Sequence, residues 1–303
     1  MRKLLTYTVR EVVPYINWIY YFHAWGMEPR FATVAKLHDC PSCRAGWVAS
    51  FPVEEQPKAR EAAKLYDETV SLLRLWADKP LCRALFLLAE AYSNGDDIII
   101  DNRLRVPFLR QQRAKKSGHT LCLSDFIKES PAASPTGKDF TDIANTIGVF
   151  ATTVATPIAP SPHDIHLSAI ADRLAEATAE KMHEEVRKSY WGYAKEEQLT
   201  MSELHEERFQ GIRPAVGYPS LPDQSVNFLV DELLCLGDIG ISLSENGAMS
   251  PHSSVSGFLF GHPKAQYFPV GEINDEQLAD YAHRRGVSIG QAKKFLAAIY
   301  SPR

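Results

Sequence analysis

Strand-length apolar runs and helix-period patterns follow one another irregularly along these 303 residues, and this order constrains the fold more than any other feature. Short apolar or β-branched runs predict strands near residues 84–89, 97–106, 147–154, 239–243, 253–260 and 266–273. Apolar residues spaced by three or four predict helices over residues 58–76, 164–190, 200–211, 226–234, 275–285 and 288–296. Hairpins separate some strands and helices separate others, unlike the strict alternation of a doubly wound sheet. We therefore expect an α+β fold, with an antiparallel or mixed sheet flanked by helices.

Turn and capping residues mark several of these boundaries. Asn102-Arg103 predicts a tight hairpin, and residues 261–263 predict a second turn between the last two strands. Thr200 to Glu203 and Ser288 to Gln291 have the spacing of a capping box at a helix start. Residues 130–138 are rich in Pro, Ser, Ala and Gly, which predicts a surface loop too short to link two independent domains. We therefore expect a single domain.

The composition excludes several classes of function. The formal net charge is -4 and the Lys and Arg residues are spread along the chain, so no cationic surface suited to nucleic acid is expected. The apolar start of the chain is broken by Thr6, Thr8 and Arg10, far too early for a signal peptide. No other apolar run approaches the ~18 residues that a membrane span requires. We expect a cytoplasmic protein that binds neither nucleic acid nor membranes.

The cysteine pattern predicts reduced thiols. There are five cysteines, an odd number without an export signal, which does not suit a disulfide framework. Cys40 and Cys43 form the only close pair, with His38 beside them. A zinc site of the usual kind would need a second pair or histidines at ligand spacing, and the flanking sequence is not the βαβ pattern of a redox motif. We expect loop thiols here and no metal site.

The sequence contains no recognisable set of catalytic residues. Residues 247–251 and 253–257 contain serines but do not form G-x-S-x-G, and neither G-x-G-x-x-G nor a P-loop is present. The helix predicted over 164–190 carries four glutamates among Lys and Arg residues, including Glu176 and Glu180. This mixture is typical of a solvated helix face with i,i+4 ion pairs. We therefore predict that these carboxylates are surface groups, and we assign no catalytic residue.

The loop from Gly211 to Pro222 is the strongest candidate for a binding site. Its two glycines and three prolines suit neither a helix nor a central strand. Such a constrained loop can hold the guanidinium of Arg213, beside Tyr218, in the fixed geometry that bidentate recognition of a carboxylate needs. Tyr267 and Phe268 are adjacent on a predicted strand, so they should point to opposite faces. One of them on the open face could stack on a purine or lie against a sulfonium cation.

A series of short motifs runs through the chain in a fixed order. They are Ala171-Asp-Arg-Leu-Ala-Glu-Ala177, His183-Glu-Glu-Val-Arg-Lys188, Tyr190-Trp-Gly-Tyr193, Phe209-Gln-Gly-Ile-Arg-Pro-Ala-Val-Gly-Tyr-Pro219, Ser253-Ser-Val-Ser-Gly257, His262-Pro263 and Asp280-Tyr-Ala-His-Arg-Arg-Gly286. Weaker matches are Tyr15-Ile-Asn-Trp18, Gly95-Asp-Asp97, Leu109-Arg-Gln-Gln112 and Cys122-Leu-Ser-Asp-Phe126. With these motifs the chain resembles the activation domain of cobalamin-dependent methionine synthase. The resemblance spans nearly all of residues 1–303 and is strongest over 165–300.

This resemblance implies a C-shaped single domain with a twisted antiparallel sheet, flanked by helices, that binds S-adenosylmethionine in a shallow groove. Arg213 would hold the methionyl carboxylate. The other implied contacts are Pro214, Ala215, Gly217 and Tyr218 along the adenosyl site, Glu176 and Glu207 near the polar groups of the ligand, and Tyr267 with Phe268 as the aromatic contact. Asn17 stands where the family usually has an aspartate, so its amide keeps an acceptor but loses a charge that would favour a cation.

The resemblance also implies a role in reactivating a methionine synthase whose cobalamin has oxidised to cob(II)alamin. A flavodoxin-type donor would supply an electron and S-adenosylmethionine a methyl group, while this domain would position the methyl group, which needs no general base or nucleophile. The 303 residues contain no homocysteine, folate or cobalamin module, so a separate cobalamin-binding methionine synthase chain is the expected partner. Two alternatives are an activator of another corrinoid methyltransferase and a non-catalytic assembly or binding protein with a decayed ligand site.

Overall fold

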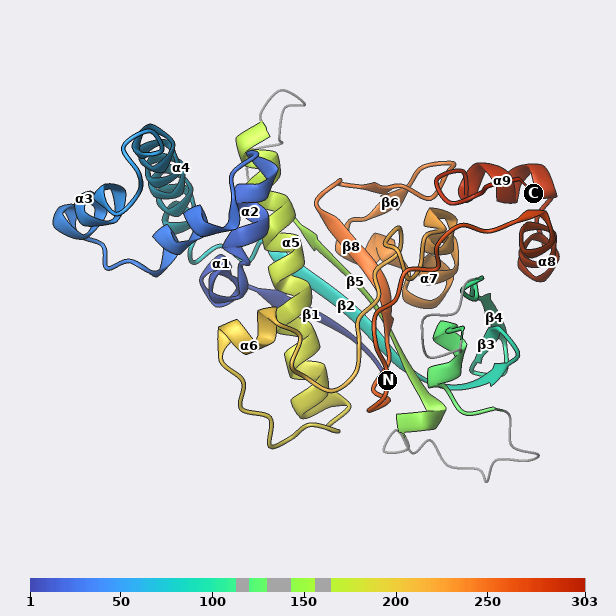
Figure 1. Cartoon of the computed structure of the whole chain (residues 1–303). Helices are drawn as coiled ribbons and strands as arrows, with labels where there is room; N and C mark the ends of the chain where they lie inside the picture. The colour runs from blue at the N-terminus through green and yellow to red at the C-terminus, as the bar shows by residue number, and fades with distance from the viewer. Residues whose placement is uncertain (113–119, 130–142, 156–164, 303) are drawn as a thin grey trace.

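A computed structural model describes residues 1–112, 120–129, 143–155 and 165–302, and a curled antiparallel sheet forms its centre (Figure 1). Its strands are β1 (Arg2–Tyr7), β2 (Cys82–Asn94), β3 (Asp97–Ile100), β4 (Leu104–Pro107), β5 (Thr146–Val154) and β8 (Ser254–Leu259). The order is β4-β3-β2-β5-β8, and β1 pairs with β2 on the edge opposite β5. Every pairing in this sheet is antiparallel. A second, two-stranded sheet pairs β6 (Ser242–Leu243) with β7 (Met249–Ser250).

Strand β5 lies in the middle of the sheet and is buried at all of its residues. Its side chains alternate between two hydrophobic cores, as the pleat of a strand requires. Val149 and Ala151 pack in the core that contains helix α7 (Asn227–Leu234), whereas Phe150 packs in the core that contains helix α5 (Ile165–Glu185). The two faces of β5 are therefore covered by different sets of helices.

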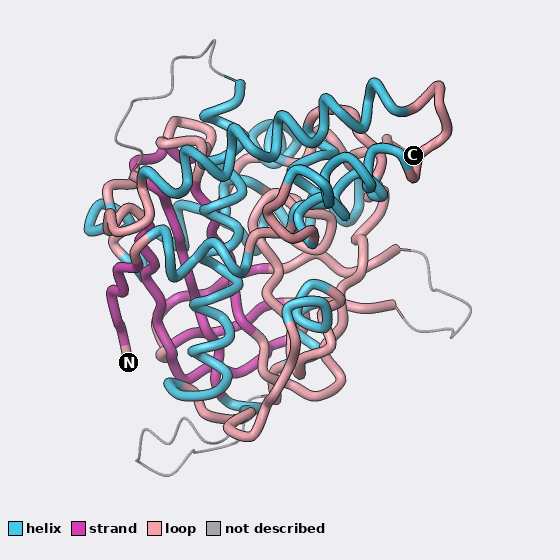
Figure 2. The backbone as a smooth tube through the Cα atoms, turned by 90° about the vertical axis from the view of Figure 1, so that its left-hand side faces the viewer, coloured by secondary structure: helices cyan, strands magenta, loops and turns pink. Residues whose placement is uncertain are grey.

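The remaining helices extend these two cores (Figure 1). On the α5 side the described helices are α1 (Val9–Val12), α2 (Trp18–Ala24), α3 (Pro41–Ala49), α4 (Gln56–Leu75) and α6 (Met201–His205). The helices α8 (Asp275–Arg285) and α9 (Ile289–Phe295) pack in the same core as α7. Figure 2 shows helical segments lying across the strands. Within the described ranges, no helix combines the length and the apolar character that crossing a membrane would require.

Most of the predicted elements are confirmed. The fold is α+β, with a curled antiparallel sheet flanked by helices, and the hairpin at Asn102-Arg103 joins β3 to β4. The helices predicted over 58–76, 226–234 and 275–285 are α4, α7 and α8. Both capping boxes form: Thr200 with Glu203 begins α6, and Ser288 with Gln291 begins α9. The predicted loop at 130–138 and the start of the helix at residue 164 lie outside the described residues.

Three predicted elements are wrong or shorter than expected. Residues 266–273 do not form a strand beside β8, because that position is taken by residues 212–216. The helix that begins at Met201 ends at His205 rather than near Gly211, and Glu207 already has a left-handed φ of 57°. The strand predicted over 239–243 is reduced to β6, because Leu236–Ile239 forms a 3-10 turn and Gly240 has a φ of 84°.

Candidate functional site

The candidate site lies where residues 211–218, here called the arginine loop, run along the edge of strand β8 that is not paired with β5. Ile212 and Phe260 exchange two backbone hydrogen bonds, of 2.9 and 3.0 Å. The loop approaches this closely because Gly257 has no side chain: a Cβ atom there would lie 2.2 Å from the carbonyl oxygen of Pro214. The arginine loop is thus held against the sheet, with its backbone position set by β8.

Arg213 is the central polar group of the site, and only 9% of it is exposed. Its Nη2 atom donates a hydrogen bond to Glu180 on α5, and its backbone N–H donates to the hydroxyl of Tyr267 at 2.8 Å. The guanidinium also faces the ring of Phe150, 5.7 Å from the ring centre. Its Nε atom has no hydrogen-bond partner among the described residues. A buried donor without a partner is unusual, and it makes Arg213 able to bind one more acceptor.

Three carboxylates surround this single guanidinium. Burial opposes the charge of Arg213, yet its pKa is raised, because Glu180 and then Tyr267, Glu176 and Glu207 favour the charged form. Burial raises the pKa of the Glu207 carboxyl, and the nearby charge of Glu180 raises it further. The excess of negative charge suits a ligand that carries a cation as well as a carboxylate.

Two tyrosines supply neutral hydroxyl groups at the site. The hydroxyl of Tyr218 donates to Glu176 at 2.9 Å, and burial and then Glu176 raise its pKa to about 12. Burial likewise raises the pKa of Tyr267 to about 12. Both hydroxyls therefore remain protonated at neutral pH. The ring of Tyr218 is half-exposed, so it lies at the solvent side of the arginine loop.

The structure places two predicted site residues away from Arg213. Phe268 is 2% exposed and packs in the core, with its ring centre 6.5 Å from that of Phe126. Asn17 caps helix α2, and its Oδ1 accepts a hydrogen bond from the backbone N–H of Ile19 at 3.1 Å. Asn17 lines a separate cavity of about 790 Å³, and Arg213 is not among the residues of its wall. Tyr267 reaches the arginine loop, whereas its neighbour Phe268 does not.

Glu180 was missed as a site residue. It pairs with the buried Arg213 instead of a lysine on the helix surface, so the prediction of a solvated face is wrong at this position. Farther along, Glu184 does form an i,i+4 pair with Lys188 at 3.3 Å, but its side chain is only 16% exposed and accepts a hydrogen bond from the Tyr15 hydroxyl, so it is not a solvated group either. A signal was present, because Glu176 and Glu180 are four residues apart and therefore lie on the same side of the helix.

The same face of α5 carries His183, which is fully buried and neutral. Neither ring nitrogen has a hydrogen-bond partner among the described residues. Burial, and then the charges of Arg187 and Arg213, hold its pKa well below the ordinary value of 6.5. Because only the unfolded chain takes up this proton, we expect the free energy of unfolding to fall as the pH drops below about 6.5, by up to about 1.4 kcal/mol per pH unit.

Urea unfolding between about pH 5 and 7 measures this dependence. His183→Leu removes the group, so its unfolding free energy should vary less steeply with pH than that of the wild type. His252→Leu changes an exposed histidine and should keep the wild-type slope. Equal slopes for the wild type and His183→Leu would show that the buried histidine is not the cause.

Two matches to known proteins cover most of the chain. The family model described as "Vitamin B12 dependent methionine synthase, activation domain" matches residues 8–286, which include the sheet strands β2, β5 and β8 as well as α5 and the arginine loop. A solved crystal structure of the MetH reactivation domain bound to AdoHcy is similar, with a TM-score of 0.80 and 32% sequence identity. That similarity covers 99% of this chain and 90% of the other.

Proposed function

Because the chain belongs to the activation-domain family of vitamin B12-dependent methionine synthases, we propose that it binds S-adenosylmethionine between α5 and the arginine loop and supports reductive methylation of cob(II)alamin. The related MetH reactivation domain has AdoHcy bound, and AdoHcy is what S-adenosylmethionine becomes when it gives up its methyl group. The proposal rests on one observation above all, the buried guanidinium of Arg213, whose Nε atom has no hydrogen-bond partner in the described part of the chain.

Arg213 would bind the methionyl carboxylate. A guanidinium presents donors in a fixed fork that matches a carboxylate, and such charge-assisted hydrogen bonds are strong in a buried setting. Three constraints hold Arg213 in place: the pair with Glu180, the hydrogen bond from its backbone to Tyr267, and the ring of Phe150. The loss of rotamer entropy on binding is therefore small, which favours affinity.

The carboxylates would meet the cationic parts of the ligand. Glu176 and Glu207 both act electrostatically on Arg213, so they lie within range of a molecule bound to it. An ammonium or sulfonium cation there would offset the excess negative charge of the site. Tyr267, beside the backbone of Arg213, is the aromatic ring placed to contact the ligand. Asn17 and Phe268 stay predictions, since the structure brings neither to Arg213.

The backbone of the arginine loop would line the adenosyl group. Pro214, Ala215, Gly217 and Tyr218 follow Arg213 directly in the chain. Gly217 has a φ of 89°, and no atom of the described residues lies within 4 Å of the position that a Cβ atom would take there. Only glycine adopts this backbone conformation easily. The open space beside it would allow a ligand to approach the main chain closely.

The part of this chain in the reaction would be to bind and orient. S-adenosylmethionine would supply an electrophilic methyl group on its sulfonium, and no residue of the site needs to act as a nucleophile or a general base. The cobalamin would be held by a cobalamin-binding methionine synthase chain, and a flavodoxin-type protein would supply the electron. Membership of the family supports the cobalamin partner.

Isothermal titration with S-adenosylmethionine tests the proposal. We expect the wild type to bind one molecule per chain. Arg213→Lys keeps the positive charge but loses the fork, so it should bind roughly 10- to 150-fold more weakly, the equivalent of about 1.5–3 kcal/mol for hydrogen bonds to a charged group. Arg30→Lys is the matched control, because Arg30 is a surface residue that pairs with Glu28 and Glu55.

No heat of binding by the folded wild type would refute the proposed function. Equal affinities for the wild type and Arg213→Lys would show that the guanidinium of Arg213 does not bind the ligand. Because Arg213 is buried, the variant is first compared with the wild type by urea unfolding, so that lost binding is not confused with lost structure.

A further inference from the structure

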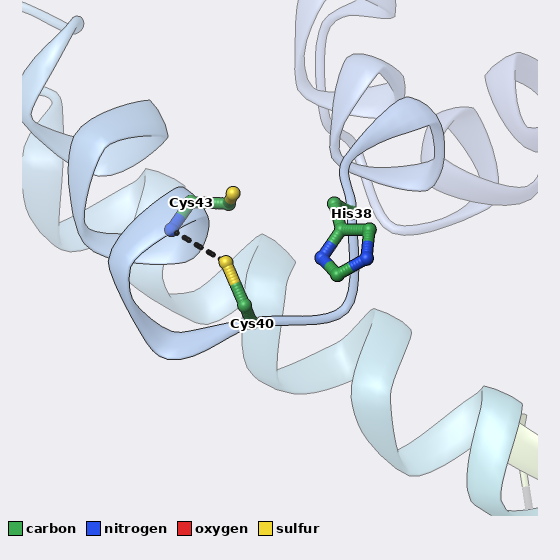
Figure 3. A group of neighbouring side chains, drawn as sticks. All are labelled: His38, Cys40 and Cys43. Atoms are coloured by element: carbon green, nitrogen blue, oxygen red, sulfur yellow. Dashed lines mark hydrogen bonds between the residues drawn. The ribbon is translucent and has the colours of Figure 1, made fainter.

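His38, Cys40 and Cys43 bring three potential metal ligands together at the start of helix α3 (Figure 3). One donor atom of each residue lies within 4.8 Å of the other two. The two cysteines are partly exposed and His38 is exposed, so an ion can reach the group from solvent. Figure 3 shows the His38 ring on one side of the Cys40 sulfur and the first turn of the helix on the other.

The local fold explains this convergence. The sequence predicted loop positions for both cysteines. Cys40 does precede the helix, as the N-cap of α3, but Cys43 lies in the first turn of α3. The backbone N–H of Cys43 donates to the Cys40 sulfur at 3.2 Å. The Ser42 hydroxyl lies 3.3 Å from the same sulfur, so two neighbouring groups orient Cys40.

Ion pairs with helix α4 fix both flanks of the group. Asp39, between His38 and Cys40, pairs with Arg74 at 2.9 Å. On the other flank Arg44 follows Cys43 directly and pairs with Asp67 at 2.5 Å. Both partners belong to α4, so the segment that carries the ligands is held against a long helix before any ion binds. Such preorganisation lowers the ordering cost of binding.

We propose that His38, Cys40 and Cys43 form a binding site for one thiophilic divalent ion of the zinc class. Two sulfurs and one imidazole nitrogen are preferred ligands of such ions, and three protein ligands with an open fourth position make a complete zinc site when water or a substrate group fills the fourth place. The sequence predicts no metal here, because it offers neither a second cysteine pair nor histidines at the usual ligand spacing. Helix α3 lies at one end of the molecule, away from β8 and the arginine loop, so this site does not depend on the proposed function (Figure 1).

Titration of the reduced chain with Co²⁺, followed by displacement with Zn²⁺, tests the site. We expect one Co²⁺ per chain, with the thiolate-to-cobalt charge-transfer and visible bands of a tetrahedral site, and loss of these bands on adding one equivalent of Zn²⁺. Cys40→Ser, Cys43→Ser and His38→Ala should each weaken binding by roughly 100-fold or more, since even residues that only orient metal ligands contribute about 10- to 100-fold.

Cys235→Ser and His252→Ala are the matched controls, because both change exposed residues outside the group. They should bind Co²⁺ as the wild type does. The proposal is overturned if the wild type shows no thiolate-to-cobalt band, or if the three ligand variants and the two controls bind equally. The reduced chain can also be given a thiol oxidant and Zn²⁺ together. If a Cys40–Cys43 disulfide then formed in preference to metal binding, the pair would be assigned to thiol redox chemistry instead.

Discussion

Gly257→Ala is expected to weaken both the fold and ligand binding, because it pushes the arginine loop away from β8. The new Cβ atom would lie 2.2 Å from the carbonyl oxygen of Pro214, 2.9 Å from the Cα of Ala215 and 3.0 Å from the ring of Phe150. The first two neighbours are backbone, which cannot move aside as a flexible side chain can. Overpacking of this kind costs about 1–3 kcal/mol and occasionally more. Urea unfolding should show that loss, and titration with S-adenosylmethionine should show weaker binding, since Pro214 adjoins Arg213.

Gly46→Ala is the matched control for this substitution. Gly46 lies in helix α3, and among the residues that the structure describes none comes within 4 Å of the position of an added Cβ atom. Alanine is preferred to glycine inside a helix by up to about 1 kcal/mol, so this variant should be as stable as the wild type or slightly more stable. If Gly257→Ala unfolded at the same urea concentration as the wild type, the loop would not need the close approach that we describe.

Local signals in the sequence were sufficient for many elements. The apolar spacing of α4 and the capping box at Ser288 depend on residues three or four apart, and both are confirmed. The hairpin at Asn102-Arg103 is equally local: Asp101 and Asn102 adopt left-handed φ values of 49° and 53°, and β4 begins directly after Arg103. Elements of this kind are predictable because the interactions that form them lie within one segment.

Residues 266–273 show where local patterns fail. Their aromatic and β-branched residues resemble a strand, but a strand also needs a free partner, and the edge of β8 is already paired with the arginine loop. Instead the segment makes isolated contacts: Val270 N–H donates to Pro219, and Phe268 N–H donates to the hydroxyl of Ser220. The competition for one edge is a tertiary effect, which no window of sequence contains.

The site was predictable only in part, for a similar reason. Residue chemistry singled out Arg213, and the family resemblance supplied the ligand and the acidic positions. Neither indicated that Glu180 would pair with Arg213, which lies 33 residues farther along the chain. That contact depends on how two separate segments are placed in space. A glutamate on a charged helix has the same local pattern whether its partner is a nearby lysine or a distant buried arginine.

Glu197→Leu is expected to be among the most destabilising single substitutions in this chain. Arg187 is fully buried, and Glu197 holds it through two hydrogen bonds, Nε to Oε2 at 3.0 Å and Nη2 to Oε1 at 2.6 Å. Removing one partner of a buried pair leaves an uncompensated charge, which costs about 3–5 kcal/mol. Urea unfolding measures the loss, with Glu206→Leu as control. Glu206 pairs with Arg208 at 2.6 Å, but both are exposed, so that change should cost less than about 1 kcal/mol.

A double variant separates the charge of this pair from its packing. Arg187→Met with Glu197→Leu replaces the pair with apolar groups of similar size, so most of the stability lost in Glu197→Leu should return. Full recovery is not expected, because the guanidinium of Arg187 also lies 4.1 Å from the ring centre of Phe209. A double variant no more stable than Glu197→Leu would show that packing, not charge, is what the pair contributes. Phe209 lies two residues before the arginine loop. The affinity of the double variant for S-adenosylmethionine therefore measures how much this buried pair contributes to the position of Arg213.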